Sequence, residues 1–73
     1  MQSIAHAPEL LLELGRALHE AGSPAHRIEE TMSAVATGAG LDAQVFSAPT
    51  LLMVSTREEG DSRTHMTRVA PKE

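Results

Sequence analysis

A change of hydrophobic period within a short chain limits the fold more than any other feature. Between Leu10 and Met32, apolar residues recur every three or four positions in two stretches, which Gly22-Ser23-Pro24 separates. Beyond this point the pattern changes to short apolar runs around Phe46. A stop signal, a restart signal and a switch to extended periodicity together predict a helix pair followed by a small sheet.

The helix boundaries follow from glycine and proline. Pro8 suits the first turn of a helix, where its missing N–H costs nothing, and Gly22 suits a left-handed cap at the end. Ser23 is then placed to cap the second helix ahead of Pro24. The apolar stripes are the expected buried faces. They comprise Leu10, Leu11, Leu14, Ala17, Leu18 and Ala21 in the first helix, and Ala25, Ile28, Met32, Val35 and Ala39 in the second.

Three runs with strand-forming residues follow, at 43–47, 51–56 and 62–69. Pro49 separates the first two runs, and the polar segment 57–61 is typical of a hairpin loop between the last two. The predicted fold is therefore α+β, with element order α-α-β-β-β and a helical hairpin packed on one face of a small antiparallel sheet.

Size and composition exclude several functions. The 73 residues allow one domain, and the apolar fraction of 41% contains a single aromatic residue. The absence of cysteine excludes disulfides and thiolate metal sites. A net charge of -4 argues against a nucleic-acid partner, which would favour an excess of basic residues. No apolar run reaches the 20 or so residues of a membrane span, so the chain as it stands is expected to be soluble.

In the run Leu51-Leu52-Met53-Val54 both faces of the predicted strand are apolar, a pattern typical of strands that are covered on two sides. Two helices can cover only one face of a small sheet. We therefore expect a later part of a longer chain or a second copy to cover the other, unless the strand has a different register. A homo-oligomer would form through Leu51, Leu52, Met53 and Val54.

The chain resembles the N-terminal cytosolic domain of the threonine/serine exporter family, a group of bacterial and fungal membrane proteins. The resemblance extends from Pro8 to Val69 and rests on the order and spacing of several short segments rather than on one motif. These segments are Leu11–Gly22, Pro24–Met32, Gly40–Ser47, Ala48–Thr50 and Thr67–Val69.

The resemblance implies a short domain that precedes a multi-helix membrane region responsible for amino-acid export. On this basis we expect a disordered segment at 1–7, an exporter-type domain at 8–70 that is incomplete at its C-terminal end, and a truncated tail at 71–73. The expected partner is the membrane region of the same protein, and the expected location is the cytoplasmic side of the membrane. Assembly, gating or substrate sensing would then be its role, without enzymatic activity and without a cofactor.

Charged side chains on the second helix offer one way to bind an amino acid. Arg27 could hold a carboxylate in a two-pronged hydrogen bond, and Glu30 or its neighbour Glu29 could hold the ammonium. Thr50 and Arg68 complete the candidate substrate-binding residues. The same helix residues are more typical of an ordinary solvated face. No metal site is predicted, because the histidines show no ligand spacing and are expected at the surface or in turns. They are His6, His19, His26 and His65.

Two alternatives from other functional classes remain open. A small hydrolase would draw its nucleophile, base and orienting group from residue types that the strand region contains, although no nucleophile elbow is present. These residues are Ser47, Thr50, Ser55, Asp61 and His65. A stand-alone interaction module would instead oligomerise through the uncovered sheet face.

Overall fold

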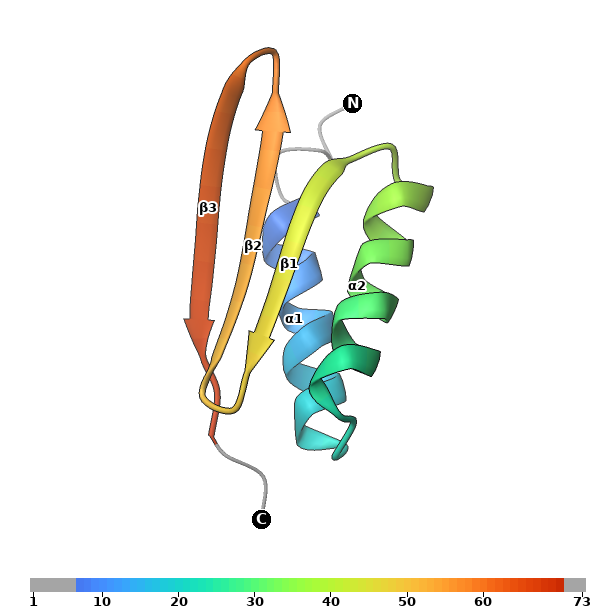
Figure 1. Ribbon diagram of the computed structural model, residues 1–73, viewed down its shortest axis with the longest axis vertical. Coiled ribbons are helices and arrows are strands. Elements are labelled where there is room, and N and C mark those ends of the chain that lie inside the picture. The colour runs from blue at the N-terminus through green and yellow to red at the C-terminus, as the bar shows by residue number, and fades with distance from the viewer. Residues whose placement is uncertain (1–6, 71–73) are drawn as a thin grey trace.

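The computed structural model describes residues 7–70, and it contains two helices followed by three strands (Figure 1). The helices are α1 (Ala7–Glu20) and α2 (Ala25–Gly38), and the strands are β1 (Asp42–Ala48), β2 (Leu51–Glu58) and β3 (Asp61–Arg68). This order confirms the predicted α-α-β-β-β arrangement. Of the segments expected to be disordered or truncated, 1–6 and 71–73 lie outside the described residues, and Ala7 is the first residue of α1.

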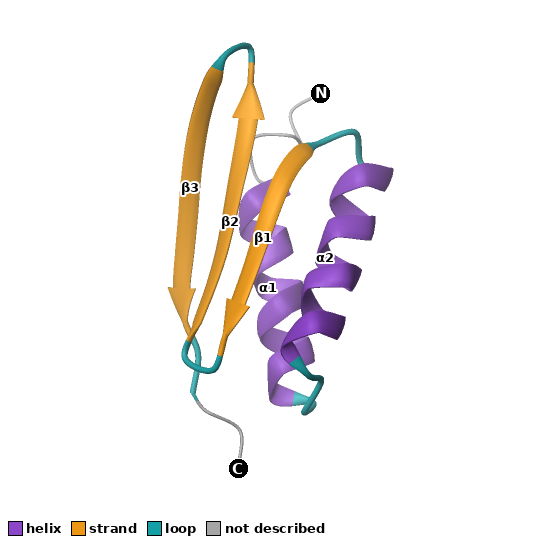
Figure 2. Cartoon of the chain, in the orientation of Figure 1, coloured by secondary structure: helices purple, strands orange, loops and turns teal. Residues whose placement is uncertain are grey.

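The three strands form one antiparallel sheet in the order β1-β2-β3, and both helices lie on the same face of it (Figure 2). Both hairpins are tight, with two residues between the strands in each. The β2–β3 turn consists of Glu59 and Gly60, both with positive φ (53° and 87°). Such a pair of left-handed residues matches the right-handed twist of the flanking strands. The observed loop is therefore shorter than the five residues predicted, because β2 and β3 extend as far as the turn.

Gly22 ends α1 in the left-handed conformation that the sequence predicts, with φ of 91°. The backbone N–H of Gly22 donates to the carbonyl of His19, and that of Ser23 donates to the carbonyl of Leu18, each at 3.0 Å. This is the double-bond pattern of a Schellman cap. The prediction that Ser23 caps α2 is wrong. Pro24 occupies the N-cap position, no side chain caps the helix, and Ser23 is already part of the cap of α1.

The core lies between the helices and the sheet. Its buried apolar side chains come from every element except β1 and β3, with Val69 just beyond the last strand; they are Leu11, Ile28, Met32, Ala36, Leu52, Val54 and Val69. The predicted helical stripes are only partly right, because Leu10 is 64% exposed and Val35 is 47% exposed. The buried positions recur at steps of four, such as Leu11 and Gly15, so each helix is rotated relative to the prediction.

α1 is attached to the end of the sheet by two side-chain hydrogen bonds across 51 positions of sequence. Arg16 Nη2 donates to Thr67 Oγ1 at 2.7 Å, and His19 Nε2 bonds to the carbonyl of Ala70. His19 is only 8% exposed, so its predicted position at the surface or in a turn is wrong. His19 lies near the end of α1, close to the residues that follow β3. A buried ring nitrogen is normally hydrogen-bonded, and the Ala70 carbonyl is the partner here.

Alternation along the strands separates two faces. Leu52 and Val54 face the helices and are fully buried, whereas Leu51 and Met53 face the other way and are half-buried. Only two of the four residues expected to form an oligomer contact are therefore accessible from outside. The face of the sheet away from the helices, called the open face below, is not covered by any described residue.

Candidate functional site

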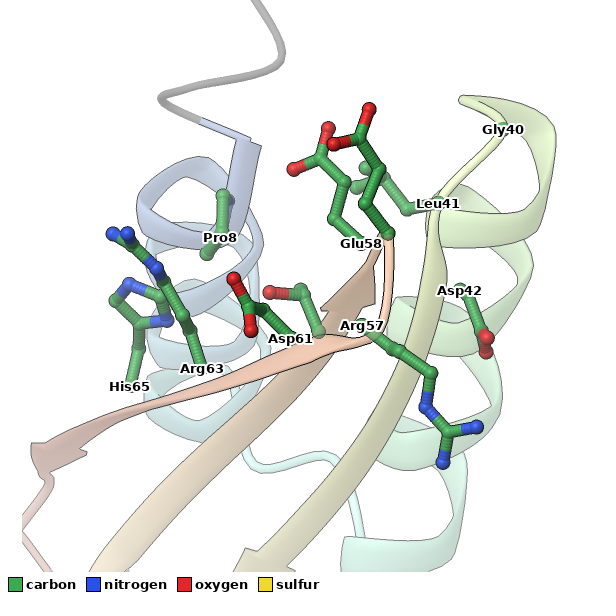
Figure 3. Close-up of a pocket in the computed structure, with 11 residues that line it drawn as sticks. Pro8, Gly40, Leu41, Asp42, Arg57, Glu58, Asp61, Arg63 and His65 are labelled. Atoms are coloured by element: carbon green, nitrogen blue, oxygen red, sulfur yellow. The ribbon is translucent and has the colours of Figure 1, made fainter.

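A pocket of about 420 Å³ lies at the end of the molecule where the β2–β3 hairpin extends beyond α1 (Figure 3). Pro8, at the start of α1, forms one side of it, and the α2–β1 connection at Gly40 forms another. The remaining lining residues come from the strands and the hairpin turn; they are Leu41, Asp42, Thr56, Arg57, Glu58, Glu59, Asp61, Arg63 and His65. We call this the hairpin pocket.

Strand register brings the polar side chains of the hairpin pocket together. Thr56 is directly opposite Arg63, and Glu58 is directly opposite Asp61. Because side chains two positions apart share a face, Asp61, Arg63 and His65 form a row on the helix-facing side of β3. The row contains both signs of charge. Figure 3 shows these three side chains on the same side of the strand as Pro8.

Arg57 and Asp42 border the hairpin pocket but belong to the open face. They are cross-strand partners, and both side chains extend away from the Asp61–His65 row in Figure 3. Arg63 is therefore the arginine on the Pro8 side of the hairpin, and the Arg57 side chain lies on the other side.

His65 carries the one buried side-chain nitrogen or oxygen without a hydrogen-bond partner among the described residues, its Nδ1 atom. The residue as a whole is half-buried and sits opposite Val54, which is fully buried. A buried polar atom that lacks a partner costs about 1–3 kcal/mol. Because protein atoms cover Nδ1, a group in the hairpin pocket reaches it only if the His65 ring turns.

The four residues predicted to bind substrate lie elsewhere. Arg27 and Glu30 are exposed on α2, Thr50 is in the β1–β2 turn, and Arg68 is on the open face opposite Leu51. None of the four lines the hairpin pocket, and no hydrogen bond or ion pair joins any two of them within residues 7–70.

The neighbouring Glu29 has a structural contact that the sequence did not reveal. Its Oε2 atom accepts a hydrogen bond from the backbone N–H of Ser47 at 2.8 Å. β1 is an edge strand, and this bond satisfies one of its outward donors from α2. Glu29 therefore fixes the second helix to the sheet edge.

The open face carries a row of apolar side chains across all three strands. Phe46 is directly opposite Met53, and Met53 is directly opposite Met66. Phe46 is 49% exposed and Met66 is 61% exposed. We call these three residues the open-face row. Polar residues, among them Gln44, Ser55 and Thr64, occupy the next positions toward the β2–β3 turn. The side of an antiparallel sheet that faces water normally carries polar side chains, so an exposed apolar row is unusual there.

Most of the chain matches a known protein family. The model described as "Putative threonine/serine exporter" matches residues 9–73, which is most of the sequence. The chain belongs to the threonine/serine exporter family. Comparison with curated proteins and with solved structures gave no match.

Membership of a threonine/serine exporter family favours a transport role over an enzymatic one. Within residues 7–70 of this exporter-family chain, no helix has the length and apolar character needed to cross a membrane. The same residues contain no group of three or more histidine or carboxylate side chains arranged to hold a metal ion.

The arrangement of the hydrolase candidates in this exporter-family domain does not form a nucleophile and base pair. Ser47 is on β1 and His65 is on β3, with β2 between them, and their positions are also offset by two residues along the strands. Strand spacing then puts their Cα atoms roughly 12 Å apart. Ser47 is 7% exposed, and Leu52 and Val54 lie between it and His65.

Proposed function

We propose that this chain is a cytosolic domain of a threonine/serine exporter and that it contributes to assembly, gating or substrate sensing of the transporter. The family match supports the transport role, and the described residues contain no membrane-spanning helix. The proposed partner is the membrane region of the same exporter. Arg27, Glu30, Thr50 and Arg68 remain proposed contact residues for substrate or partner.

The observation that carries the assembly role is the open-face row. Three large apolar side chains in one register line, two of them about half exposed, are the kind of surface that a partner covers. Arg68 borders the row on the open face, and a charged rim around an apolar centre is typical of protein interfaces. Covering the row offers the hydrophobic stabilisation that a small aliphatic core otherwise lacks.

The test is threonine export by cells that carry the exporter in its native form. The cells are loaded with a threonine-containing dipeptide, and the rate of threonine release is measured. Replacing Phe46 and Met66 by Thr keeps strand-forming residues but removes the apolar surface. We expect a several-fold slower release, whereas Gln44→Thr on the same strand face should leave the rate unchanged. Circular dichroism of the purified chain verifies that the variants fold.

An unchanged release rate in the Phe46→Thr/Met66→Thr variant would overturn the assembly role of the row. An equal loss in Gln44→Thr would do the same, because a polar neighbour should not matter. Sedimentation of the purified chain separates the two possible occupants. If the purified chain is a monomer, the membrane region remains the proposed occupant of the row. If it is a dimer that dissociates in the double variant, the occupant is a second copy of the chain.

A further inference from the structure

We infer that the hairpin pocket binds a small zwitterion, with the ligand carboxylate at Arg63 and His65 and the ligand ammonium at Asp61 and Glu58. The inference rests on the proposed function in one respect, since that function makes a free α-amino acid the zwitterion to test. The site itself is argued from the residues that line the pocket.

The shape of the hairpin pocket suits a small ligand. Its volume of about 420 Å³ lies at the lower end of the range of roughly 300–1,000 Å³ found for ligand sites. Its walls come from the first turn of α1, the end of α2 and the β2–β3 hairpin. A ligand there would contact segments from both ends of the chain, from Pro8 to His65.

Four of the polar side chains that line the hairpin pocket form two groups, Glu59 adds a further carboxylate at the turn, and Asp42 and Arg57 belong to the open face. Arg63 and His65 are adjacent members of the helix-facing row on β3, while Asp61 and Glu58 are paired across the strands next to the turn. Within residues 7–70, the side chains of Glu58, Asp61 and Arg63 form no ion pair or hydrogen bond with another residue. These three side chains are exposed, so a ligand in the pocket would compete only with water for their hydrogen bonds.

Arg63 and His65 together fit a carboxylate. A guanidinium presents parallel N–H donors that match the two oxygens of a carboxylate. The His65 ring lines the pocket next to Arg63, and a turn of the ring that uncovers the unpartnered Nδ1 would let this atom donate to one ligand oxygen. The start of α1 at Pro8 adds the positive end of a helix dipole on the same side of the pocket.

Asp61 and Glu58 fit the ammonium of the same ligand. Both carboxylates are exposed at the hairpin end of the pocket, and each is two residues closer to the turn than Thr56 or Arg63. A ligand with only an anionic group would meet repulsion from these carboxylates, and a ligand with only a cationic group would meet Arg63. Because both groups of side chains are needed, the pocket selects for a small molecule that carries both charges.

The test is a titration of the purified chain with L-threonine, followed by backbone amide chemical shifts. Because the charged groups are largely solvated, we expect a dissociation constant on the order of 1 mM. Saturable shifts should centre on residues 56–65. Threonine amide, which lacks the carboxylate, and 3-hydroxybutyrate, which lacks the ammonium, should each bind at least about tenfold more weakly.

A matched pair of arginine variants tests the site. Arg63→Gln should weaken L-threonine binding about tenfold, because it removes the guanidinium that lines the pocket on the side of Pro8 and His65. Arg57→Gln changes the net charge equally on the same hairpin, but the Arg57 side chain extends away from Asp61 and His65, so binding should weaken much less than in Arg63→Gln.

Three outcomes would overturn the inference. The first is the absence of saturable shifts at a threonine concentration about tenfold above the expected dissociation constant. The others are equal binding of threonine and either analogue, and equal effects of the two arginine variants. All three are measured without export and with the open-face row intact. Failure of threonine binding is therefore distinguishable from failure of the proposed assembly role, which depends on Phe46 and Met66.

Discussion

Gly15 is the position where the fold can be tested most directly by one methyl group. It is buried in the middle of α1, and a Cβ atom there would lie 2.6 Å from Met32 Sδ and 3.0 Å from Leu52 Cδ1. Non-bonded heavy atoms normally approach to about 3.5–4.0 Å. Since Met32 and Leu52 are both fully buried, neither side chain can move into solvent to make room. Gly15 thus sets the distance between α1 and the rest of the core.

Two opposing effects determine the stability of Gly15→Ala. In a helix interior, alanine is favoured over glycine by about 1 kcal/mol. Overpacking a closed core with one methyl group costs about 1–3 kcal/mol. The expected net effect is a loss of up to about 2 kcal/mol in the free energy of unfolding. For a domain of this size each 1 kcal/mol lowers the melting temperature by roughly 4–8 °C.

Gly38 supplies the matched control. It ends α2, and a Cβ atom there has nothing within 4 Å. Gly38→Ala should therefore raise the stability, by a few tenths of a kcal/mol up to about 1 kcal/mol because the position is terminal. Urea denaturation of both variants gives the difference between the two sites, which we expect to be a few tenths of a kcal/mol up to about 3 kcal/mol in favour of Gly38→Ala.

A double variant isolates the steric contact with Met32. Met32→Ala alone should cost about 2–5 kcal/mol, since it opens a cavity in the core. In that background the methyl group at position 15 enters the freed space, so Gly15→Ala should become neutral or stabilising. The coupling free energy should favour the pair by about 1–3 kcal/mol. Equal gains at positions 15 and 38, or no coupling with Met32, would refute the close approach of α1 to the core.

Two further predictions concern single contacts. Glu59 holds a φ of 53° in the β2–β3 turn, and asparagine tolerates that conformation better, so Glu59→Asn should raise the free energy of unfolding by about 0.5–1 kcal/mol in urea denaturation; a loss of stability would argue against the two-residue turn. Glu29→Ala removes the acceptor of the Ser47 N–H and should cost about 1–2 kcal/mol, whereas Glu29→Gln keeps an acceptor and should cost less, and equal costs would show that the hydrogen bond to Ser47 contributes nothing.

The elements were predictable from sequence because their signals are local. Gly22 ends α1 through its own backbone freedom, and Pro49 interrupts the strands through its missing N–H. The rotation of the helices was not predictable. It depends on which residue lets α1 approach the sheet most closely. That residue is Gly15, which does not count as an apolar position in a hydrophobic pattern.

The hairpin pocket was missed for a related reason. Its residues are polar and up to 57 positions apart, as Pro8 and His65 show, so no local pattern joins them. One signal was available. If Glu59-Gly60 is treated as a two-residue turn, Glu58 must be opposite Asp61, and the register then places Arg63 opposite Thr56. A five-residue loop conceals this arrangement because it ends both strands too early.

The same strand alternation separates the two proposed sites of this domain. In β3, His65 faces the helices and lines the hairpin pocket, while its neighbour Met66 belongs to the open-face row. A partner that covers the open face therefore leaves the helix-facing side of Arg63 and His65 accessible. Because register fixes both surfaces at once, a slip of one residue between β2 and β3 would exchange their side chains. Independent effects of Arg63→Gln on binding and of Phe46→Thr/Met66→Thr on export are thus what this register requires.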